Sequence, residues 1–181
     1  MNKVRKFNTF YLPLSDWIYS IHKKDNKTKI IGLSGGQGAG KSTITEILKF
    51  ILKKKYGVEL CIFSIDDFYK TKAERKKMSQ KVHPLFLTRG VPGTHDVNLI
   101  SKTFKNLKKK FFKPVLIPKF DKSIDDRSKK SQWIKIKKPP SVIIFEGWCV
   151  GAKHQKENLL KKPLNMIEKK YDKDIKWRKK V

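Results

Sequence analysis

The feature that most constrains this sequence is a glycine-rich run that ends in lysine and serine, Gly35-Gly36-Gln37-Gly38-Ala39-Gly40-Lys41-Ser42. It fits the pattern of glycine, four residues, glycine, lysine and serine or threonine that binds nucleotide phosphates. Residues 29–34 before it are typical of a short buried strand, and residues 42–54 after it carry apolar side chains at helical spacing. Strand, loop and helix follow in the order that the motif requires, so the run predicts a nucleoside-triphosphate site.

Each part of this loop has a physical task. Glycines adopt backbone angles closed to other residues and let phosphates approach the main chain, while successive N–H groups and the helix N-terminus face the anion. Lys41 would reach the β- and γ-phosphates, and the Ser42 hydroxyl would bind Mg²⁺. The predicted nucleotide-binding residues are Gly35, Gly36, Gln37, Gly38, Ala39, Gly40, Lys41, Ser42 and Thr43.

Length and composition favour a single globular domain over residues 1–181. Of the 181 residues, 38% are hydrophobic, which is enough for one domain with a core. The sequence has no apolar run of the roughly 18 residues that a membrane span needs, and its first residues lack a signal-peptide core. We therefore expect a cytoplasmic protein without a membrane partner. The two cysteines suggest neither a disulfide framework nor a zinc site, and the oligomeric state stays unknown.

The formal net charge of +28 raises nucleic acid as an alternative partner, because a basic surface attracts phosphate backbones. The charge is overwhelmingly lysine, however, and the lysines are spread over every segment. Bidentate phosphate clamps and base-reading contacts favour arginine. We therefore expect solvated lysine faces and no specific nucleic-acid partner, with a nucleotide-gated nucleic-acid-binding protein as the alternative.

Periodicity along the chain predicts further strands and helices. Apolar runs predict strands over residues 58–65, 115–117 and 141–145, and the last is typical of a parallel strand buried on both faces. Helical spacing predicts helices over residues 14–21 and 96–109. Together these elements predict an α/β fold, the three-layer fold of P-loop NTPases with a parallel sheet.

Three segments fall outside this repeating pattern. Residues 1–28 are expected to form an N-terminal helical extension. Residues 70–140 are irregular and rich in proline, which is typical of an insertion that covers a substrate. Residues 153–181 are rich in lysine and would begin a C-terminal region.

Carboxylates follow two of the predicted strands. Asp66 and Asp67 come after the strand over residues 58–65, and Glu146 ends the strand over residues 141–145. Ligands of open α/β sheets bind at the carboxyl ends of the strands. An aspartate there, facing the γ-phosphate, would accept the proton of an attacking hydroxyl, and Glu146 would hold Mg²⁺ through water. The alternatives are aspartates that cap a turn and a glutamate paired with a lysine.

Several blocks of the sequence together resemble one family. The blocks are residues 31–42, 64–69, 83–85, 88–96, 118–122, 125–127 and 145–152. Arg-Gly-Val-Pro-Gly-Thr-His-Asp, which starts at Arg89, and Phe-Glu-Gly-Trp-Cys-Val-Gly, which starts at Phe145, are far more specific than the phosphate loop. On these blocks the chain from about Leu12 onward resembles the D-glycerate 3-kinases of the plant and fungal type, which are relatives of uridine kinase, phosphoribulokinase and pantothenate kinase.

The resemblance implies an ATP-dependent kinase that phosphorylates the 3-hydroxyl of D-glycerate with ATP and Mg²⁺. In the wider superfamily the first acid after the second strand activates the acceptor hydroxyl, and that position is Asp66, so the implied catalytic residues are Asp66 and Lys41. The acceptor would bind over residues 83–96. The implied acceptor residues are Asp67, Tyr69, His83, Arg89, His95 and Arg127.

Arg89 is the attractive partner for the glycerate carboxylate, because a guanidinium binds a carboxylate through two parallel hydrogen bonds. The alternatives are that Arg89 pairs with a loop aspartate, that His95 caps the helix beginning at Asp96, and that Tyr69 packs in the core.

Family members are longer than this chain, which ends at Val181 within a helix-forming pattern. We therefore expect a fragment whose parallel sheet is incomplete at the C-terminus, with the remaining strands and the lid to follow. Two further alternatives stay open: a kinase for another hydroxylated metabolite of the uridine or pantothenate type, and a catalytically silent nucleotide binder.

Overall fold

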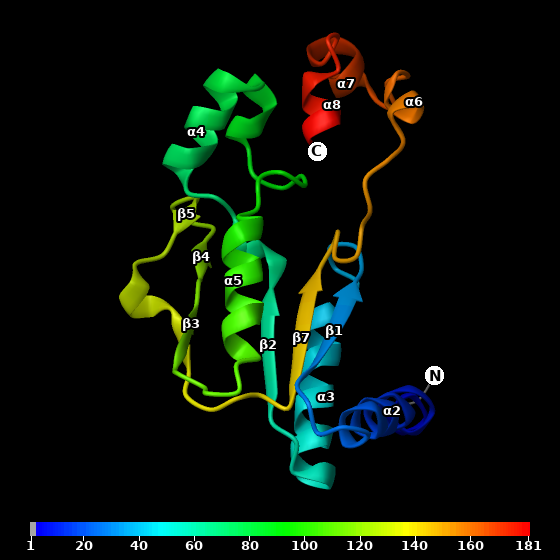
Figure 1. Ribbon diagram of the computed structural model, residues 1–181. Helices are drawn as coiled ribbons and strands as arrows, with labels where there is room; N and C mark the ends of the chain where they lie inside the picture. The colour runs from blue at the N-terminus through cyan, green and yellow to red at the C-terminus, as the bar shows by residue number, and fades with distance from the viewer. Residues whose placement is uncertain (1–2) are drawn as a thin grey trace. The chain divides into compact units, whose positions relative to one another are not determined.

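The computed structural model describes residues 3–181, which form two compact units (Figure 1). The first unit comprises the described residues up to Ile65 together with Thr103–Ile117 and Lys135–Gly151. The second comprises Asp66–Lys102, Pro118–Ile134 and Ala152–Val181. Among residues 3–181, none of the helices combines the length and the apolar character that crossing a membrane requires.

The first unit contains the parallel sheet. Its elements are α1 (Lys3–Lys6), the π-helical turn η1 (Phe7–Tyr11), α2 (Leu12–Lys23), β1 (Lys29–Ser34), α3 (Lys41–Tyr56), β2 (Leu60–Ser64), β3 (Val115–Ile117), most of β6 (Ile134–Ile136), β7 (Val142–Gly147) and the second half of α5 (Val97–Leu107). The strand order is β1-β7-β2, and β7 runs parallel to both neighbours (Figure 1). Val142 pairs with Lys29 on one side and with Leu60 on the other. The strand that comes last in the chain therefore occupies the centre of the sheet.

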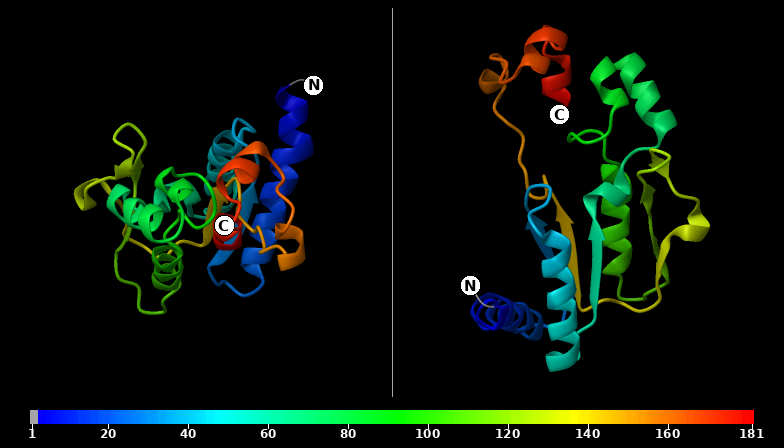
Figure 2. Two further views of the ribbon diagram at one scale, coloured as in Figure 1. Left: turned by 90° about the horizontal axis from the view of Figure 1, so that it is seen from above. Right: turned by 180° about the vertical axis from the view of Figure 1, so that it is seen from behind.

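Helices cover both faces of this sheet. On one face α2 and α3 bury an apolar cluster against the strands, with Ile18, Leu52 and Ile144 each at most 1% exposed. The right-hand view of Figure 2 shows α3 in front of the sheet. On the other face Phe104 of α5 packs its ring against Phe63 and Phe145, with ring centres 5.5 and 5.2 Å away. The alternating side chains of buried strands thus supply two apolar layers.

Gly147 ends β7 where no side chain fits. A Cβ atom there would lie 2.3 Å from Cγ2 and 3.1 Å from Cβ of Ile65, and the backbone fixes the Ile65 Cβ atom whatever the rotamer. We expect Gly147→Ala to lower the free energy of unfolding by about 1–3 kcal/mol, the usual cost of overpacking. Urea unfolding measures this loss. Gly36→Ala is the matched control, because its added Cβ meets nothing within 4 Å; equal losses in both variants would contradict the prediction.

The second unit consists of short elements. They are η2 (Ile65–Phe68), α4 (Lys72–Lys81), η3 (Pro84–Leu87), the first half of α5, β4 (Phe120–Asp121), β5 (Asp126–Arg127), η4 (Lys130–Gln132), α6 (Glu157–Leu160), α7 (Met166–Tyr171) and α8 (Lys176–Lys180). A capping box starts α4: the Thr71 hydroxyl accepts the Glu74 N–H, while the Glu74 carboxylate accepts the Thr71 N–H. The strands β4 and β5 form an antiparallel hairpin.

The C-terminal helices of the second unit lie against the segment before α5. Gly93 has a φ of 89°, and a Cβ there would come within 3.2 Å of the Lys180 carbonyl oxygen. A glycine is therefore required for two reasons, its left-handed backbone and the close approach of α8.

Candidate functional site

The phosphate loop connects β1 to α3 and takes backbone angles that glycine allows. Gly38 and Gly40 have φ angles of 76° and 79°, and Gly40 is the residue that caps α3. The Ala39 N–H donates to the Gly36 carbonyl at 3.3 Å, which closes a tight turn. The first N–H groups of α3 point along the loop as they do in any helix N-terminus, and this arrangement suits an anion.

Lys41 holds its cation against the loop. Its Nζ donates to the carbonyl oxygens of Gly35 at 2.8 Å and Gly36 at 2.9 Å. The loop residues from Gly36 to Gly40, together with Ser42 and Thr43, are exposed. The predicted nucleotide-binding residues therefore form one continuous, accessible turn with an ammonium group folded over it.

Ser42 and Glu146 are the predicted Mg²⁺ ligands, and both belong to the first unit. Glu146 lies near the carboxyl end of the central strand, in register with Leu33 on β1 and Ser64 on β2, and its side chain is half-buried. Hydroxyl and carboxylate oxygens are hard donors of the kind that Mg²⁺ prefers. The donor set therefore fits this ion.

Asp66 and Asp67 lie in η2, at the start of the second unit. The Asp66 carboxylate accepts a hydrogen bond from Lys122 Nζ at 2.9 Å, and about a third of its side chain, 31%, is exposed. The Asp67 carboxylate instead accepts the Phe120 N–H at 3.4 Å. Asp66 thus pairs with a lysine after β4, while Asp67 binds the backbone of β4 itself.

Tyr69 and His95 stack on one another in the interior of the second unit. Their ring centres are 4.4 Å apart, and Tyr69 also packs edge-on against Phe120 at 5.3 Å. Tyr69 is 4% and His95 3% exposed. Within the described part of the chain, His95 Nε2 has no hydrogen-bond partner, so an unsatisfied polar atom lies in this interior.

Acidification is expected to destabilise the protein through His95. Burial lowers the pKa of its imidazole from 6.5 to about 4, while the charge of Asp66 opposes the shift and that of Lys70 adds to it. Between these two pH values the unfolded chain binds more protons than the folded one, so stability falls as the pH falls. At pH 4 the loss reaches about 3 kcal/mol. Urea unfolding from pH 7 to pH 4 measures it, and His95→Gln should flatten the slope; an equally steep slope in that variant would contradict the assignment.

Arg127 joins the start of α5 to Tyr69. Its Nη2 donates to the Tyr69 carbonyl at 2.8 Å and to the Asp96 carboxylate at 3.3 Å. Asp96 also accepts the Leu99 N–H at 3.0 Å. The helix is therefore capped by Asp96, and the alternative in which His95 provides the cap is wrong.

Arg89 is paired with Asp125, as the aspartate alternative predicted. Its guanidinium also lies over the Phe120 ring, 5.4 Å from the ring centre. Asp125 also pairs with Arg75, a buried arginine that is 1% exposed. Arg75 was not identified from the sequence. The capping-box residues Thr71 and Glu74 were the signal that could have placed Arg75 on a helix.

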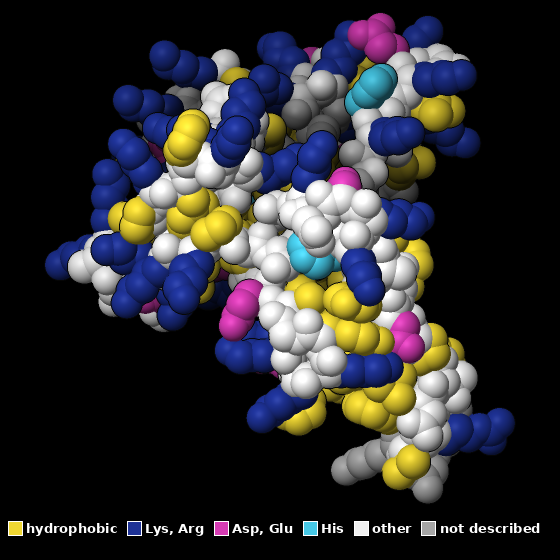
Figure 3. Space-filling view, turned by 60° about the horizontal axis from the view of Figure 1, so that its bottom comes forward, with side chains coloured by type: hydrophobic (Ala, Val, Ile, Leu, Met, Phe, Trp, Pro, Cys, Tyr) yellow, Lys and Arg dark blue, Asp and Glu magenta, His cyan; other side chains and the backbone are white. Residues whose placement is uncertain are grey.

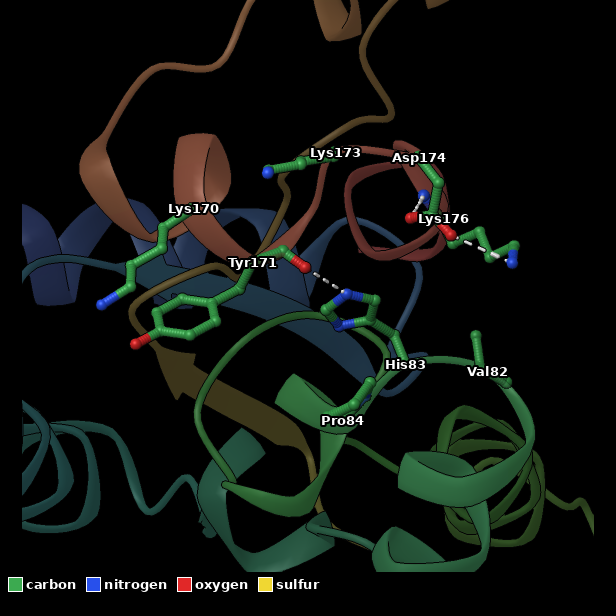
Figure 4. A pocket seen from close by; sticks show the side chains of 8 residues that line it. All are labelled: Val82, His83, Pro84, Lys170, Tyr171, Lys173, Asp174 and Lys176. Carbon is green, nitrogen blue, oxygen red and sulfur yellow. Dashed lines mark hydrogen bonds and ion pairs between the residues drawn. The ribbon is translucent and has the colours of Figure 1, made fainter.

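Both ring nitrogens of His83 make hydrogen bonds with the protein backbone. Nδ1 accepts the Leu85 N–H at 3.3 Å, so Nε2 carries the proton and donates it to the Tyr171 carbonyl at 2.8 Å (Figure 4). These contacts hold η3 to α7 beside a pocket that His83, Pro84 and Tyr171 help to line. The other predicted acceptor residues meet elsewhere in the second unit, around Phe120 and Tyr69.

The basic side chains form several groups on the face drawn in Figure 3. Lysine and arginine are dense on its left and upper parts and sparser at the lower right. This distribution is consistent with lysines that keep the surface solvated.

A parallel three-stranded sheet, helices on both faces and a phosphate loop after β1 define a P-loop nucleotide-binding protein. Within that class, the sequence pattern of the Phosphoribulokinase / Uridine kinase family matches residues 30–181, and the chain belongs to this family. The predicted α/β P-loop fold with a parallel sheet is confirmed.

Individual proteins are similar over most of the chain. The uncharacterized kinase mug58 of Schizosaccharomyces pombe is 39% identical over 136 residues, which cover 71% of this chain and 49% of mug58. The chloroplastic D-glycerate 3-kinase of Arabidopsis thaliana is 33% identical over 162 residues, 80% of this chain and 35% of that protein. The solved structure of D-glycerate 3-kinase from Cryptococcus neoformans matches with a TM-score of 0.74 and 28% identity, over 84% of this chain and 57% of that one. This chain thus spans about half the length, or less, of the curated relatives described.

Proposed function

We propose that this chain takes part in ATP-dependent phosphorylation of the 3-hydroxyl of D-glycerate, with 3-phosphoglycerate and ADP as products. Membership of a kinase family supports phosphoryl transfer, and two of the similar proteins are D-glycerate 3-kinases. Relatives of the family also act on other alcohols, as its name states for phosphoribulokinase and uridine kinase. The acceptor is therefore the part of the proposal that most needs a test.

The donor half is the phosphate loop. Its N–H groups and Lys41 bind the β- and γ-phosphates of ATP. The Lys41 ammonium already lies against the loop, so its positive charge is in place without any rearrangement of α3. Ser42 and Glu146 are the residues that would hold Mg²⁺, which when bound neutralises charge on the phosphate oxygens. Charge neutralisation and positioning are the main demands of phosphoryl transfer.

The acceptor half begins at Asp66. Its carboxylate takes the proton of the glycerate 3-hydroxyl while the hydroxyl oxygen forms a bond to the γ-phosphorus. The bond from that phosphorus to the β,γ-bridging oxygen breaks, and ADP leaves with the electron pair. The Lys122 ammonium pairs with this carboxylate at 2.9 Å and holds it in place beside β4.

The observation that carries the choice of a carboxylate acceptor is the state of Arg89. Asp125 uses Nη1 of its guanidinium, while the side chain keeps 29% of its surface exposed. A guanidinium in this state suits a carboxylate ligand. Uridine and other uncharged acceptors have no group that needs it.

Coupled measurement of ADP release tests the proposal. The chain is given Mg-ATP with D-glycerate, uridine, ribulose 5-phosphate or pantothenate in separate reactions. We expect ADP release above the water background with D-glycerate and little with the other three. Turnover with D-glycerate no faster than with water would refute the acceptor, and turnover with uridine alone would move the chain to the nucleoside kinases.

A further inference from the structure

Arg75 is a buried cation whose hydrogen bonds converge on the residues around Arg89. The Arg75 side chain is 1% exposed, and burying its charge without hydrogen-bond partners would be costly in free energy. Its Nη1 donates to the Leu87 carbonyl at 2.7 Å, two residues before Arg89, and its Nε donates to the Lys70 carbonyl at 3.2 Å. Its Nη2 donates to the Asp125 carbonyl at 2.7 Å and pairs with that residue's carboxylate at 2.9 Å. One side chain therefore holds both the segment that carries Arg89 and the turn that carries Asp125.

Asp125 connects the two arginines. It lies between β4 and β5 with a φ of 53°, a left-handed conformation that aspartate and asparagine tolerate better than most residues. One carboxylate oxygen pairs with Arg75 and the other with Arg89. Burial disfavours the charged form, but hydrogen bonds from Arg75 and Arg89 outweigh it and lower the pKa of Asp125. The carboxylate therefore stays ionised and fixed by two partners.

Arg89 is held at one edge and on one face. Asp125 takes Nη1, and the Phe120 ring lies under the guanidinium. Within the part of the chain that the structure describes, its other N–H groups make no further hydrogen bond with the protein. Two guanidiniums and one carboxylate together carry one net positive charge, so a single anionic group would neutralise the cluster.

We infer that Asp125 and Arg75 are positioning residues for Arg89, which they orient so that its remaining N–H groups bind the carboxylate of the acceptor. The inference rests on the proposed function and deepens it, because it assigns the selection of a small hydroxy acid to this cluster. Phe120 connects the cluster to the proposed base: its ring supports Arg89, and its N–H is bound by Asp67, the neighbour of Asp66. Arg89 and the neighbour of the proposed base thus both contact Phe120 of β4.

A double-mutant cycle tests whether Asp125 acts through Arg89. Asp125→Asn preserves the size of the side chain and suits the left-handed backbone, while Arg89→Gln removes the proposed carboxylate partner itself. Each single variant should raise KM for D-glycerate about 10- to 100-fold, the usual effect of losing a hydrogen bond to a charged group, with KM for ATP unchanged. The double variant should have the same KM for D-glycerate as Arg89→Gln alone, because the effects of substitutions at coupled residues do not add.

The matched control is Asp121→Asn, which changes an aspartate of the same hairpin whose carboxylate binds Ser123 instead of an arginine. Its KM for D-glycerate should stay at the wild-type value. Effects of the two variants that multiply in the double variant, or an equal rise in Asp121→Asn, would overturn the inference and leave the proposed function intact. If Asp125→Asn unfolds, Arg89→Gln must still raise KM for D-glycerate without affecting that for ATP. Wild-type chain without turnover on D-glycerate would refute the proposed function itself.

Discussion

Replacing Asp66 with asparagine is expected to lower phosphoryl transfer about 10²- to 10⁴-fold, the usual contribution of a general base. Asparagine has nearly the same shape but cannot accept the proton of the hydroxyl. ATP binding should be unchanged, because the substitution leaves the phosphate loop and the Lys41 ammonium as they are. Single-turnover kinetics measure the chemical step, and titration with a fluorescent ATP analogue measures nucleotide affinity.

Lys122→Ala is the control that separates the proton acceptor from its ion pair. This variant removes the same 2.9 Å contact with Asp66 but leaves the carboxylate in place. Because the Lys122 side chain is 62% exposed, the loss of the pair should change the rate by no more than about threefold, in keeping with the small energies of surface ion pairs. Preserved turnover in Asp66→Asn would rule out the assigned base.

Replacing Lys41 with methionine is expected to reduce kcat/KM for ATP about 10²- to 10³-fold, the scale of losing one charged or hydrogen-bonding group that stabilises the transition state. Methionine keeps most of the aliphatic length but lacks the ammonium. The two hydrogen bonds to Gly35 and Gly36 disappear as well. Global stability should change little, because the core of α3 is formed by Leu48, Ile51 and Leu52. Steady-state kinetics and urea unfolding measure the two effects.

Lys49→Met tests whether the loss is local. Lys49 is also on α3, is about half exposed, and pairs with Glu46 at 4.0 Å. Both variants remove the same unit of charge from a chain with a net charge of +28, so general attraction of ATP falls equally in both. A comparable loss of kcat/KM in Lys49→Met would mean that the charge acts at long range and not through the phosphate loop.

Much of the first unit follows from local patterns. The predicted strand over residues 29–34 is β1, residues 115–117 are β3, and the helix predicted from residue 42 begins one residue earlier, as α3. Buried parallel strands are continuous apolar runs, and a helix packed on them needs an apolar stripe, so both leave a local signal. The position of β7 between β1 and β2 leaves no such signal, because strand order depends on tertiary packing.

The second unit was harder to predict because polar contacts determine it. Residues 72–81 were expected to be irregular, yet they form α4, a lysine-rich helix whose one buried residue is Arg75. A helix without an apolar stripe escapes any test of hydrophobic periodicity. The pairing of Arg75 and Arg89 with Asp125 joins residues far apart in the sequence. By contrast, the turn of the phosphate loop and the start of α3 were predictable, because their pattern lies in consecutive residues.

The central place of β7 has a consequence for how the nucleotide site forms. In the parallel sheet β1 and β2 are bonded to β7 and not to each other, and the first residue of the phosphate loop, Gly35, donates its N–H to the carbonyl of Gly147 at the end of β7. While the chain emerges from the ribosome, the loop is synthesised early but stays without its supporting strand until residues 142–147 arrive. We therefore expect the loop to bind ATP only once residues 29–34 have paired with residues 142–147.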